Sequence, residues 1–583
     1  MSKYRSFKWS DDRKKMAVLI VLVLATIFRL FLFYNTPLRF ATEQVYDDQM
    51  MYNYAKSLSE FRWLGGYNLT TLCKEISFPL FVAVCHWISI PYSLALGMLC
   101  IGSAYVFVKA TSTLVTSFHV KAVFYILLIY APIGFSALVA QRTYQLSVRP
   151  YATILVISCM IAIFLRRDEK DLWKWSIGAA VSLVFFWFIR GDSIWIMPFV
   201  ISVILITTGC LLWKKHLLQY GIKKRIFMAF FPVLFLFVAI LGISSINYMV
   251  YGIFVTNDRS GSNFGELMDC LYTIEDKDAP LTVWCSNKAI EDAVNASPTL
   301  KSIEKEILAQ EYSWGGGSYK DMEGDMPTWV LRSALNDAGL YENAREMNEF
   351  CGQVVKELQA AFKSGKLVRD GYIHIGGVQI QNEYIDNGKY WRDFVKYAIG
   401  VAEYKGPIAQ VSGASVSTGD VYSIRSWERF FNSFTIYPDI PNGEIGEIIQ
   451  DPAKADNYKI QICIEKICYI FYRFTGLVNI LAIVSFVFIT IALFFNKAKH
   501  IEMWLPILGI ILTFILHVLS VVLFTNFIKS ESYVYMYLAG AYPLIQIAKY
   551  LSIYQGVVLI KQYYIKKIVK RMQKKGRYNK WIK

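Results

Sequence analysis

Two adjacent carboxylates, Asp47 and Asp48, stand shortly after the first long apolar stretch of the chain. A carboxylate there can accept a proton from an attacking hydroxyl, and a pair can hold a divalent cation such as Mg²⁺, Mn²⁺ or Ca²⁺. Asp is also a preferred N-cap, so a helix from near Asp48 to Ser59 accounts for both acids without any chemistry. Asp47 falls in helical register with Met51 and Leu58, which predicts that it faces packed protein.

Lys74 and Glu75 form a second charged pair, directly before the next apolar run. The Lys74 ammonium can meet a phosphate, and Glu75 can face the acid pair as a further carboxylate. The alternative is that both are interfacial residues whose charged ends reach into water.

Three arginines lie in short polar turns between apolar runs. Arg142 and Arg149 belong to "QRTYQLSVRP", and Arg190 belongs to "FIRGDS". The planar fork of arginine suits phosphate, so each is a candidate for an anion site. The alternative for each is that it anchors the end of a helix. Asp192 is predicted to be the N-cap of the helix that follows.

Two tryptophans lie on glycine-flanked loops, Trp63 in "RWLGGY" and Trp314 in "YSWGGGSY". Glycine lets a backbone approach a ligand closely, and an indole ring suits stacking on a sugar. Packing beneath a loop is the alternative for both rings.

The composition is that of a membrane protein, with 55% hydrophobic and 16% aromatic residues among 583 and a mean hydropathy of +0.36. About ten stretches are long and apolar enough to span a bilayer as helices. They are 16–36, 79–108, 120–141, 147–165, 174–190, 194–213, 226–247, 468–495, 501–526 and 533–560. The stretch 79–108 contains Pro91, which predicts a broken helix or two shorter pieces. We therefore expect a polytopic α-helical membrane protein with about ten transmembrane helices.

The net charge of +16 is a topology signal and does not indicate a nucleic-acid partner. Basic residues gather in alternate connections, which the positive-inside rule places in the cytoplasm together with both termini. The basic C-terminal tail is also expected to rest on anionic membrane lipids. The prediction is a multi-pass protein of the plasma membrane. Its expected segments are cytoplasmic tails at 1–15 and 563–583, an N-terminal module at 16–249 with an outer loop at 37–78, an extracytoplasmic domain at 250–467, and C-terminal helices at 468–562.

The extracytoplasmic domain is predicted to be mixed but mostly helical. The runs "SPTLKSIEKEILAQEY" and "YENAREMNEFCGQVVKELQAAFKSGKL" have helical periodicity, and the second ends at a glycine. "LTVWC" and "YIHIGGVQI" are typical of short strands, and "WGGGSYKDMEGDMP" is typical of a loop. The ten cysteines show no metal-ligand spacing, and a disulfide between Cys270 and Cys285 is left open.

The stretch "DDQMMYNYAKSLSEFRWLGGYNLTTLCKEISFPLF" resembles the first loop of GT-C superfamily membrane glycosyltransferases, which include protein mannosyltransferase-like and aminoarabinose transferase-like enzymes. That group has an Asp-Asp or Asp-Glu pair, a tyrosine shortly after, then a small residue and a leucine on an amphipathic loop helix. Asp47, Asp48, Tyr52, Ala55 and Leu58 fill those positions here. "FIRGDSIWIMP" is similar to the Arg-acidic turn of bacterial proteins of this type. The match is clearest over about 40–260, and the proline-rich and histidine-bearing motifs of some relatives are absent, which leaves the substrate open.

The resemblance implies a GT-C-like fold and an enzyme that takes a sugar from a polyprenyl-phosphate carrier. The acceptor is an extracytoplasmic glycan, lipid or protein of the cell envelope, and the displacement inverts the anomeric carbon. A carboxylate takes the acceptor's proton and cations neutralise the leaving phosphate. Asp47 is then the expected base or metal ligand, Asp48 its partner and Glu75 a further catalytic candidate. The donor-phosphate candidates are Arg190, Arg142, Lys74 and Arg149, and the substrate-binding candidates are Tyr52, Trp63, Asp192 and Trp314. Some members use a metal and others use basic side chains. Three of these cations, Arg190, Arg142 and Lys74, are expected near the acid pair and favour the metal-free version, with a divalent cation left open.

Two other classes of protein fit parts of the pattern. A transporter or flippase for lipid-linked sugars predicts functional charges near the bilayer midplane and repeated halves, whereas these charges lie at the ends of spans and no repeat is visible. A non-catalytic membrane scaffold that binds an envelope polymer predicts that Asp47 and Asp48 tolerate replacement by Asn.

Overall fold

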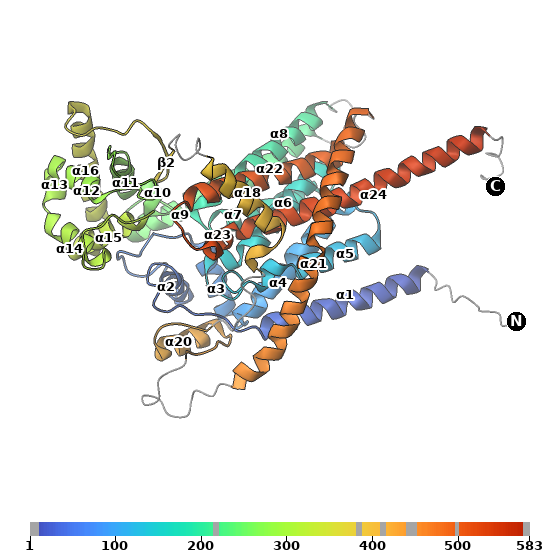
Figure 1. The fold of residues 1–583 in the computed structure, drawn as a ribbon, viewed down its shortest axis with the longest axis horizontal. Coiled ribbons are helices and arrows are strands. Elements are labelled where there is room, and N and C mark those ends of the chain that lie inside the picture. The colour runs from blue at the N-terminus through green and yellow to red at the C-terminus, as the bar shows by residue number, and fades with distance from the viewer. Residues whose placement is uncertain are drawn as a thin grey trace.

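The computed structural model describes residues 11–213, 221–380, 388–407, 416–438, 452–495 and 501–574. Within these ranges the chain is almost entirely helical (Figure 1). Parts of the basic tails and connections lie outside the described residues, at 1–10, 214–220, 496–500 and 575–583.

The first part of the chain forms a bundle with short connecting helices. Its elements are α1 Asp11–Tyr34, α2 Asp48–Ser59, α3 Ser77–Trp87, α4 Tyr92–Ala110, η1 Thr111–Thr113, α5 Phe118–Ile129, η2 Pro132–Phe135, η3 Gln145–Ser147, α6 Arg149–Leu165, α7 Leu172–Trp187, η4 Gly191–Ile196, α8 Met197–Trp213 and α9 Ile222–Tyr251. The chain returns to this bundle after the inserted domain with α18 Lys389–Ala402, α20 Val421–Phe431, α21 Pro452–Phe495, α22 Ile501–Phe524, α23 Glu531–Tyr537, η7 Leu538–Gly540 and α24 Ala541–Lys574.

Eight of the described helices are long and apolar enough to cross a membrane, which suggests a multi-pass membrane protein. Three shorter apolar helices, α3, α6 and α7, accompany them. The predicted spans 147–165 and 174–190 correspond to α6 and α7, which have 17 and 16 residues. The predicted break at Pro91 is confirmed, because α3 ends before it and α4 begins after it.

Helix α6 lies among α4, α7, α8 and α24, and nearly all of its side chains are buried. Its small residues Ala152, Ser158 and Ala162 allow neighbouring helices to approach closely. The N-terminal end of α1 and the C-terminal end of α24 both lie on the side away from the green domain of Figure 1.

That domain, here called the inserted domain, spans 258–380 and has a hydrophobic core separate from that of the bundle. Its elements are α10 Asp258–Gly261, α11 Asn263–Tyr272, α12 Asn287–Ala296, α13 Pro298–Lys301, α14 Glu304–Trp314, α15 Met326–Asp337, η6 Leu340–Glu342, α16 Ala344–Ser364, β1 Ile373–Ile375 and β2 Val378–Ile380. The described segments at 388–438 instead contribute side chains such as Val401 and Trp427 to the bundle core. Helix α21 begins at Pro452, before the predicted span start at 468.

The local predictions for this domain are mostly confirmed. The second periodic run forms α16, which ends at Gly365 in the left-handed conformation, and the first run forms α13 and α14. "YIHIGGVQI" forms the antiparallel hairpin β1–β2. The predicted strand "LTVWC" is wrong: Val283 makes only an isolated bridge to Gly324. Its amide donates to Pro280 O at 2.8 Å, so a turn uses the donor that a ladder would need.

A buried ion pair fastens the inserted domain to the connection between α2 and α3. Arg332 Nη1 lies 3.0 Å from both carboxylate oxygens of Asp258, and both side chains are 0% exposed. Arg332 Nε also donates to Leu69 O at 2.8 Å, and the Asp258 amide donates to Leu72 O at 2.9 Å. Removing one partner of a buried pair of this kind typically costs about 3–5 kcal/mol of stability. The connection that carries Lys74 and Glu75 is therefore held firmly against the domain.

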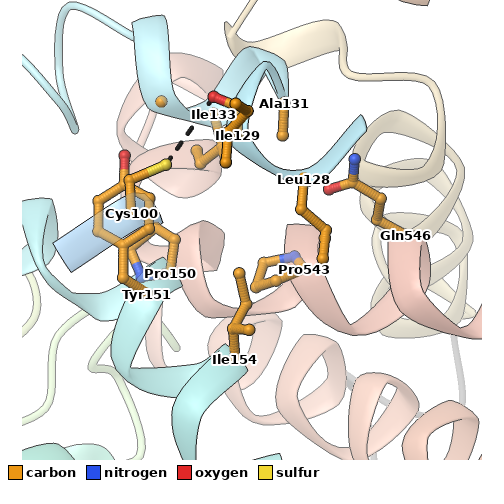
Figure 2. Close-up of a pocket in the computed structure, with 11 residues that line it drawn as sticks. Cys100, Leu128, Ile129, Ala131, Ile133, Pro150, Tyr151, Ile154, Pro543 and Gln546 are labelled. Carbon is orange, nitrogen blue, oxygen red and sulfur yellow. Dashed lines mark hydrogen bonds between the residues drawn. The ribbon is translucent and has the colours of Figure 1, made fainter. Parts of the chain in front are cut away.

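A small apolar cavity lies inside the bundle between α4, α5, α6 and α24 (Figure 2). Its volume is ≈ 10 Å³, about the space of one water molecule. Cys100 Sγ donates to Ile129 O at 3.8 Å across one wall. A space of this size cannot hold a substrate, so the charged groups at the end of the bundle are the candidates for a site.

Candidate functional site

Helix α2 begins at Asp48 and ends at Ser59, as predicted. Asp47 occupies its N-cap position, yet its side chain makes no capping hydrogen bond. The carboxylate instead accepts hydrogen bonds from Lys74 Nζ at 2.9 Å and Tyr144 Oη at 2.9 Å. Helix capping therefore does not account for this acid.

The expectation that Asp47 faces packed protein is met only in part, because its carboxylate contacts Lys74 and Tyr144 but keeps an exposed side. Its side chain is 39% exposed, whereas that of Asp48 is 0% exposed. Asp47 has φ −128° and ψ −90°, so the helical register that holds for Met51 and Leu58 does not extend back to it. Asp48 is the acid that points into the core.

The surroundings of Asp47 keep it ionised. Burial by itself would raise the pKa of its carboxyl, but the charge and hydrogen bond of Lys74, the charge of Arg142 and the hydrogen bond from Tyr144 lower that pKa below its usual range. Burial would lower the pKa of Lys74, and Asp47 raises it above its ordinary value. The site thus holds a partly exposed carboxylate beside a protonated ammonium.

The Asp48 carboxylate forms an ion pair with Arg142. Arg142 Nε lies 2.9 Å and 3.1 Å from the two Asp48 oxygens, and Nη2 donates to the second of them. Arg142 Nη1 contacts Met536 Sδ at 3.7 Å, and Nη2 lies 3.9 Å from Asp47. A cation held by both acids would have to displace this guanidinium. Among the described residues, no group of three or more His, Cys, Asp or Glu side chains could hold a metal ion.

The Arg190 guanidinium has spare hydrogen-bonding capacity among the described residues. Its guanidinium lies 4.3 Å from the ring centroid of Tyr537, and Nε lies 3.6 Å from Asp192 Oδ2. Its buried Nη1 has no hydrogen-bond acceptor among the described residues. Burial would lower the pKa of Arg190, but Asp192, Tyr537, Tyr144 and Asp47 together raise it above its ordinary value. Arg190 therefore stays charged within the electrostatic reach of Asp47.

Local structure explains how Lys74 and Arg190 come together. The Ser77 amide at the start of α3 donates to Phe188 O, just after the end of α7, at 2.7 Å. Lys74 precedes α3 and Arg190 follows α7, so this contact places both cations at the same end of the bundle.

Arg149 and Asp192 lie behind Arg190. Arg149 is buried, and it donates to Asp192 Oδ1 at 2.7 Å and to Ser193 Oγ at 3.2 Å. Ser193 Oγ in turn donates to Arg190 O. Asp192 belongs to η4 and is not the N-cap that the sequence predicts; that position is held by Arg190. Arg149 thus holds the turn that presents Arg190.

Trp314 reaches the site from the inserted domain. Its ring centroid lies 5.5 Å from that of Tyr46, the neighbour of Asp47, and Tyr46 also lies 4.5 Å from Trp329. The ion pair Arg259–Asp325 lies beside Trp329, with the Arg259 guanidinium 5.4 Å from the Trp329 ring. The inserted domain therefore packs two tryptophans against Tyr46, next to the acid pair, with the Arg259–Asp325 ion pair beside one of them.

Three sequence-predicted residues are placed away from Asp47. Tyr52 is buried against Trp427, with ring centroids 4.6 Å apart. Trp63 packs against the bundle core and donates from Nε1 to Asn247 Oδ1 at 2.8 Å. Glu75 is buried and accepts from Asn257 Nδ2.

Glu75 gives a prediction on pH dependence. Burial outweighs the hydrogen bond from Asn257 and raises its pKa from 4.5 to about 7. Between these values the folded protein keeps a proton that the unfolded chain has released, so stability falls as pH rises. Glu75→Gln stays neutral and keeps an acceptor for Asn257, so it should gain stability over the wild type at pH 8, by on the order of 3 kcal/mol, and little at pH 4.5.

The measurement is the unfolding temperature of both proteins in detergent across this pH range. Glu349→Gln, on the exposed face of α16, is the matched control. A constant difference between Glu75→Gln and wild type at all pH values would contradict the assignment.

Sequence reasoning missed Tyr144, Tyr537, Arg259 and Asp325. Tyr144 lies in the turn "QRTYQLSVRP", two residues after Arg142, and this position was the only feature of the sequence that could have indicated a role. The other three come from segments far along the chain and carry no distinguishing local pattern. Cys270 and Cys285 are both free and buried, so no disulfide joins them.

Searches against protein-family models, curated proteins and solved structures find no match to this chain.

Proposed function

We propose that this chain is an integral membrane glycosyltransferase of GT-C type. It would transfer a sugar from a polyprenyl-phosphate-linked donor to an acceptor hydroxyl in the cell envelope. The observation that carries the proposal is that Asp47, an ionised and partly exposed carboxylate, lies within the electrostatic reach of Arg190, whose Nη1 lacks an acceptor among the described residues. A base and an unsatisfied cation at one end of an apolar bundle suit a lipid-linked phosphosugar.

In the proposed step the acceptor oxygen attacks the anomeric carbon from the face opposite the phosphate. The new C–O bond forms as the bond between the anomeric carbon and the phosphate oxygen breaks, and the electron pair leaves on that oxygen. The acceptor's proton passes to Asp47. The hydroxyl becomes acidic only as its new bond forms, so a carboxylate with a lowered pKa suffices as base.

Arg190 is assigned to the charge that develops on the leaving phosphate, with Lys74 beside it. Lys74 also holds Asp47 ionised before reaction. Arg142 and Arg149 are assigned positioning roles, because their guanidinium groups are occupied by Asp48 and Asp192.

The site is proposed to face the extracytoplasmic side of the plasma membrane. The inserted domain lies opposite the ends of α1 and α24 that lead to the basic tails (Figure 1). The positive-inside rule places those tails in the cytoplasm.

The test is donor turnover by the purified full chain in lipid nanodiscs. Polyprenyl phosphates carrying different radiolabelled sugars are supplied with envelope extract as acceptor, and the lipid products are separated. The expected result is release of free polyprenyl phosphate with label moving into the extract. Donors that all remain intact would overturn the proposal. Movement of intact donor between leaflets of liposomes would instead identify a flippase.

A further inference from the structure

We propose that the inserted domain forms an acceptor subsite that binds a carbohydrate chain, built from Tyr46, Trp314, Trp329, Arg259 and Asp325. The inference rests on the proposed glycosyl transfer and names its acceptor class. It follows from the juxtaposition of an aromatic cluster, which includes the neighbour of Asp47, with a partly exposed ion pair.

The aromatic part of the subsite adjoins the proposed base. Tyr46 directly precedes Asp47, and its ring packs against Trp329 and Trp314 with centroid distances of 4.5 Å and 5.5 Å. Trp329 is buried, whereas Trp314 and Tyr46 are partly exposed. Trp314 therefore places a partly exposed indole ring against Tyr46, the residue directly before the proposed base Asp47.

The polar part is the ion pair Arg259–Asp325. Arg259 Nη2 lies 2.8 Å from Asp325 Oδ2, and the two side chains are 27% and 29% exposed. This differs from the neighbouring pair Arg332–Asp258, which is 0% exposed and serves to fasten the domain. A guanidinium has five N–H donors and a carboxylate has about four acceptor positions, and their mutual bond uses one of each.

Both charged groups interact electrostatically with residues of the bundle. Arg259 interacts electrostatically with Lys74, and Asp325 interacts electrostatically with Tyr537, the ring that packs on Arg190. The charged side chains of the inserted domain therefore lie within electrostatic reach of the proposed donor site.

This combination has the chemistry of a sugar-binding surface. A pyranose ring presents apolar C–H groups on its faces and hydroxyls around its rim. An indole face can stack against the C–H groups. A guanidinium–carboxylate pair can donate hydrogen bonds to the hydroxyls and accept hydrogen bonds from them. The loop after Trp314 begins with three glycines, and Gly316 and Gly317 have positive φ, so no side chain of theirs obstructs a chain lying on the indole.

Binding can be measured without catalysis. The wild-type full chain in nanodiscs is applied to an array of pyranose oligosaccharides of different linkage. We expect binding to at least one class, weakened about tenfold by Trp314→Ala, the equivalent of losing one aromatic contact. Trp314→Phe should restore most of the binding, and Asp325→Asn should weaken it independently.

Tyr312→Ala is the matched control, because Tyr312 is an exposed aromatic residue of the same helix α14 that contacts Tyr319 and not Tyr46. It should bind as the wild type does. A wild-type chain that binds no oligosaccharide, or a folded Trp314→Ala chain that binds as the wild type does, overturns the inference.

Donor cleavage by water separates this inference from the proposed function. The wild-type chain should cleave the polyprenyl-phosphate sugar with water when acceptor is omitted. Cleavage without carbohydrate binding would overturn the acceptor assignment alone. The absence of donor cleavage by wild-type protein, with or without acceptor, would remove the transferase.

Discussion

Asp47→Asn is expected to reduce sugar transfer by at least about 100-fold, which is the usual contribution of a positioned general base. Asparagine has nearly the same size and can still accept hydrogen bonds from Lys74 and Tyr144, so the fold should be kept. It cannot take the acceptor's proton. The measurement is transfer of labelled sugar from a polyprenyl carrier under saturating donor.

The control for this prediction is Glu60→Gln, which removes an exposed carboxylate at the end of α2 and should leave transfer unchanged. Unfolding temperatures of both variants should match the wild type. Turnover by Asp47→Asn at the wild-type rate would remove Asp47 from the mechanism.

Arg190→Met is expected to reduce turnover by about 100- to 1,000-fold, the range seen when one preorganised donor to a developing anion is lost. Methionine can fill the space beside Tyr537 but carries no charge. The donor KM should rise while the acceptor KM stays near the wild-type value, because Arg190 is assigned to the phosphate. Steady-state kinetics with each substrate varied in turn give both values.

Arg62→Met supplies the comparison, since Arg62 is an exposed arginine on the α2–α3 connection that pairs only with Glu60 among the described residues. It should have wild-type kinetics. Equal increases in donor and acceptor KM for Arg190→Met would count against a phosphate role and favour a structural one.

Much of the fold could be predicted because its signals are local. Apolar length identifies the spans, Pro91 identifies the break between α3 and α4, and a glycine identifies the end of α16. The strand expected in "LTVWC" fails for a local reason as well, since Pro280 starts a turn that uses the Val283 amide.

The site itself was only partly predictable. The sequence indicates that Asp47, Lys74, Arg142 and Arg190 share one end of the bundle, since they occupy connections on the same side. It does not show which cations are already occupied. That depends on whether Arg142 meets Asp48 from 94 positions away, and no property of either segment alone specifies such a meeting.

The partial exposure of Asp47 shows that prediction from sequence also fails between neighbouring residues. Helical register assigns it to the packed face, but the N-cap residue has non-helical dihedral angles, which turn its side chain outward. One residue decides which of two identical acids is partly exposed and which is held in the core.

The ion pair between Asp258 and Arg332 bears on how the protein is made. The peptide oxygen of Leu69 accepts a hydrogen bond from Arg332, which is synthesised 263 residues later. The contact between Arg190 and the ring of Tyr537 joins residues that lie even further apart in the chain. A ribosome that has released only the first half of the chain has therefore completed neither contact. Both form late, and the contact at Arg190 requires the segment that leads into α24.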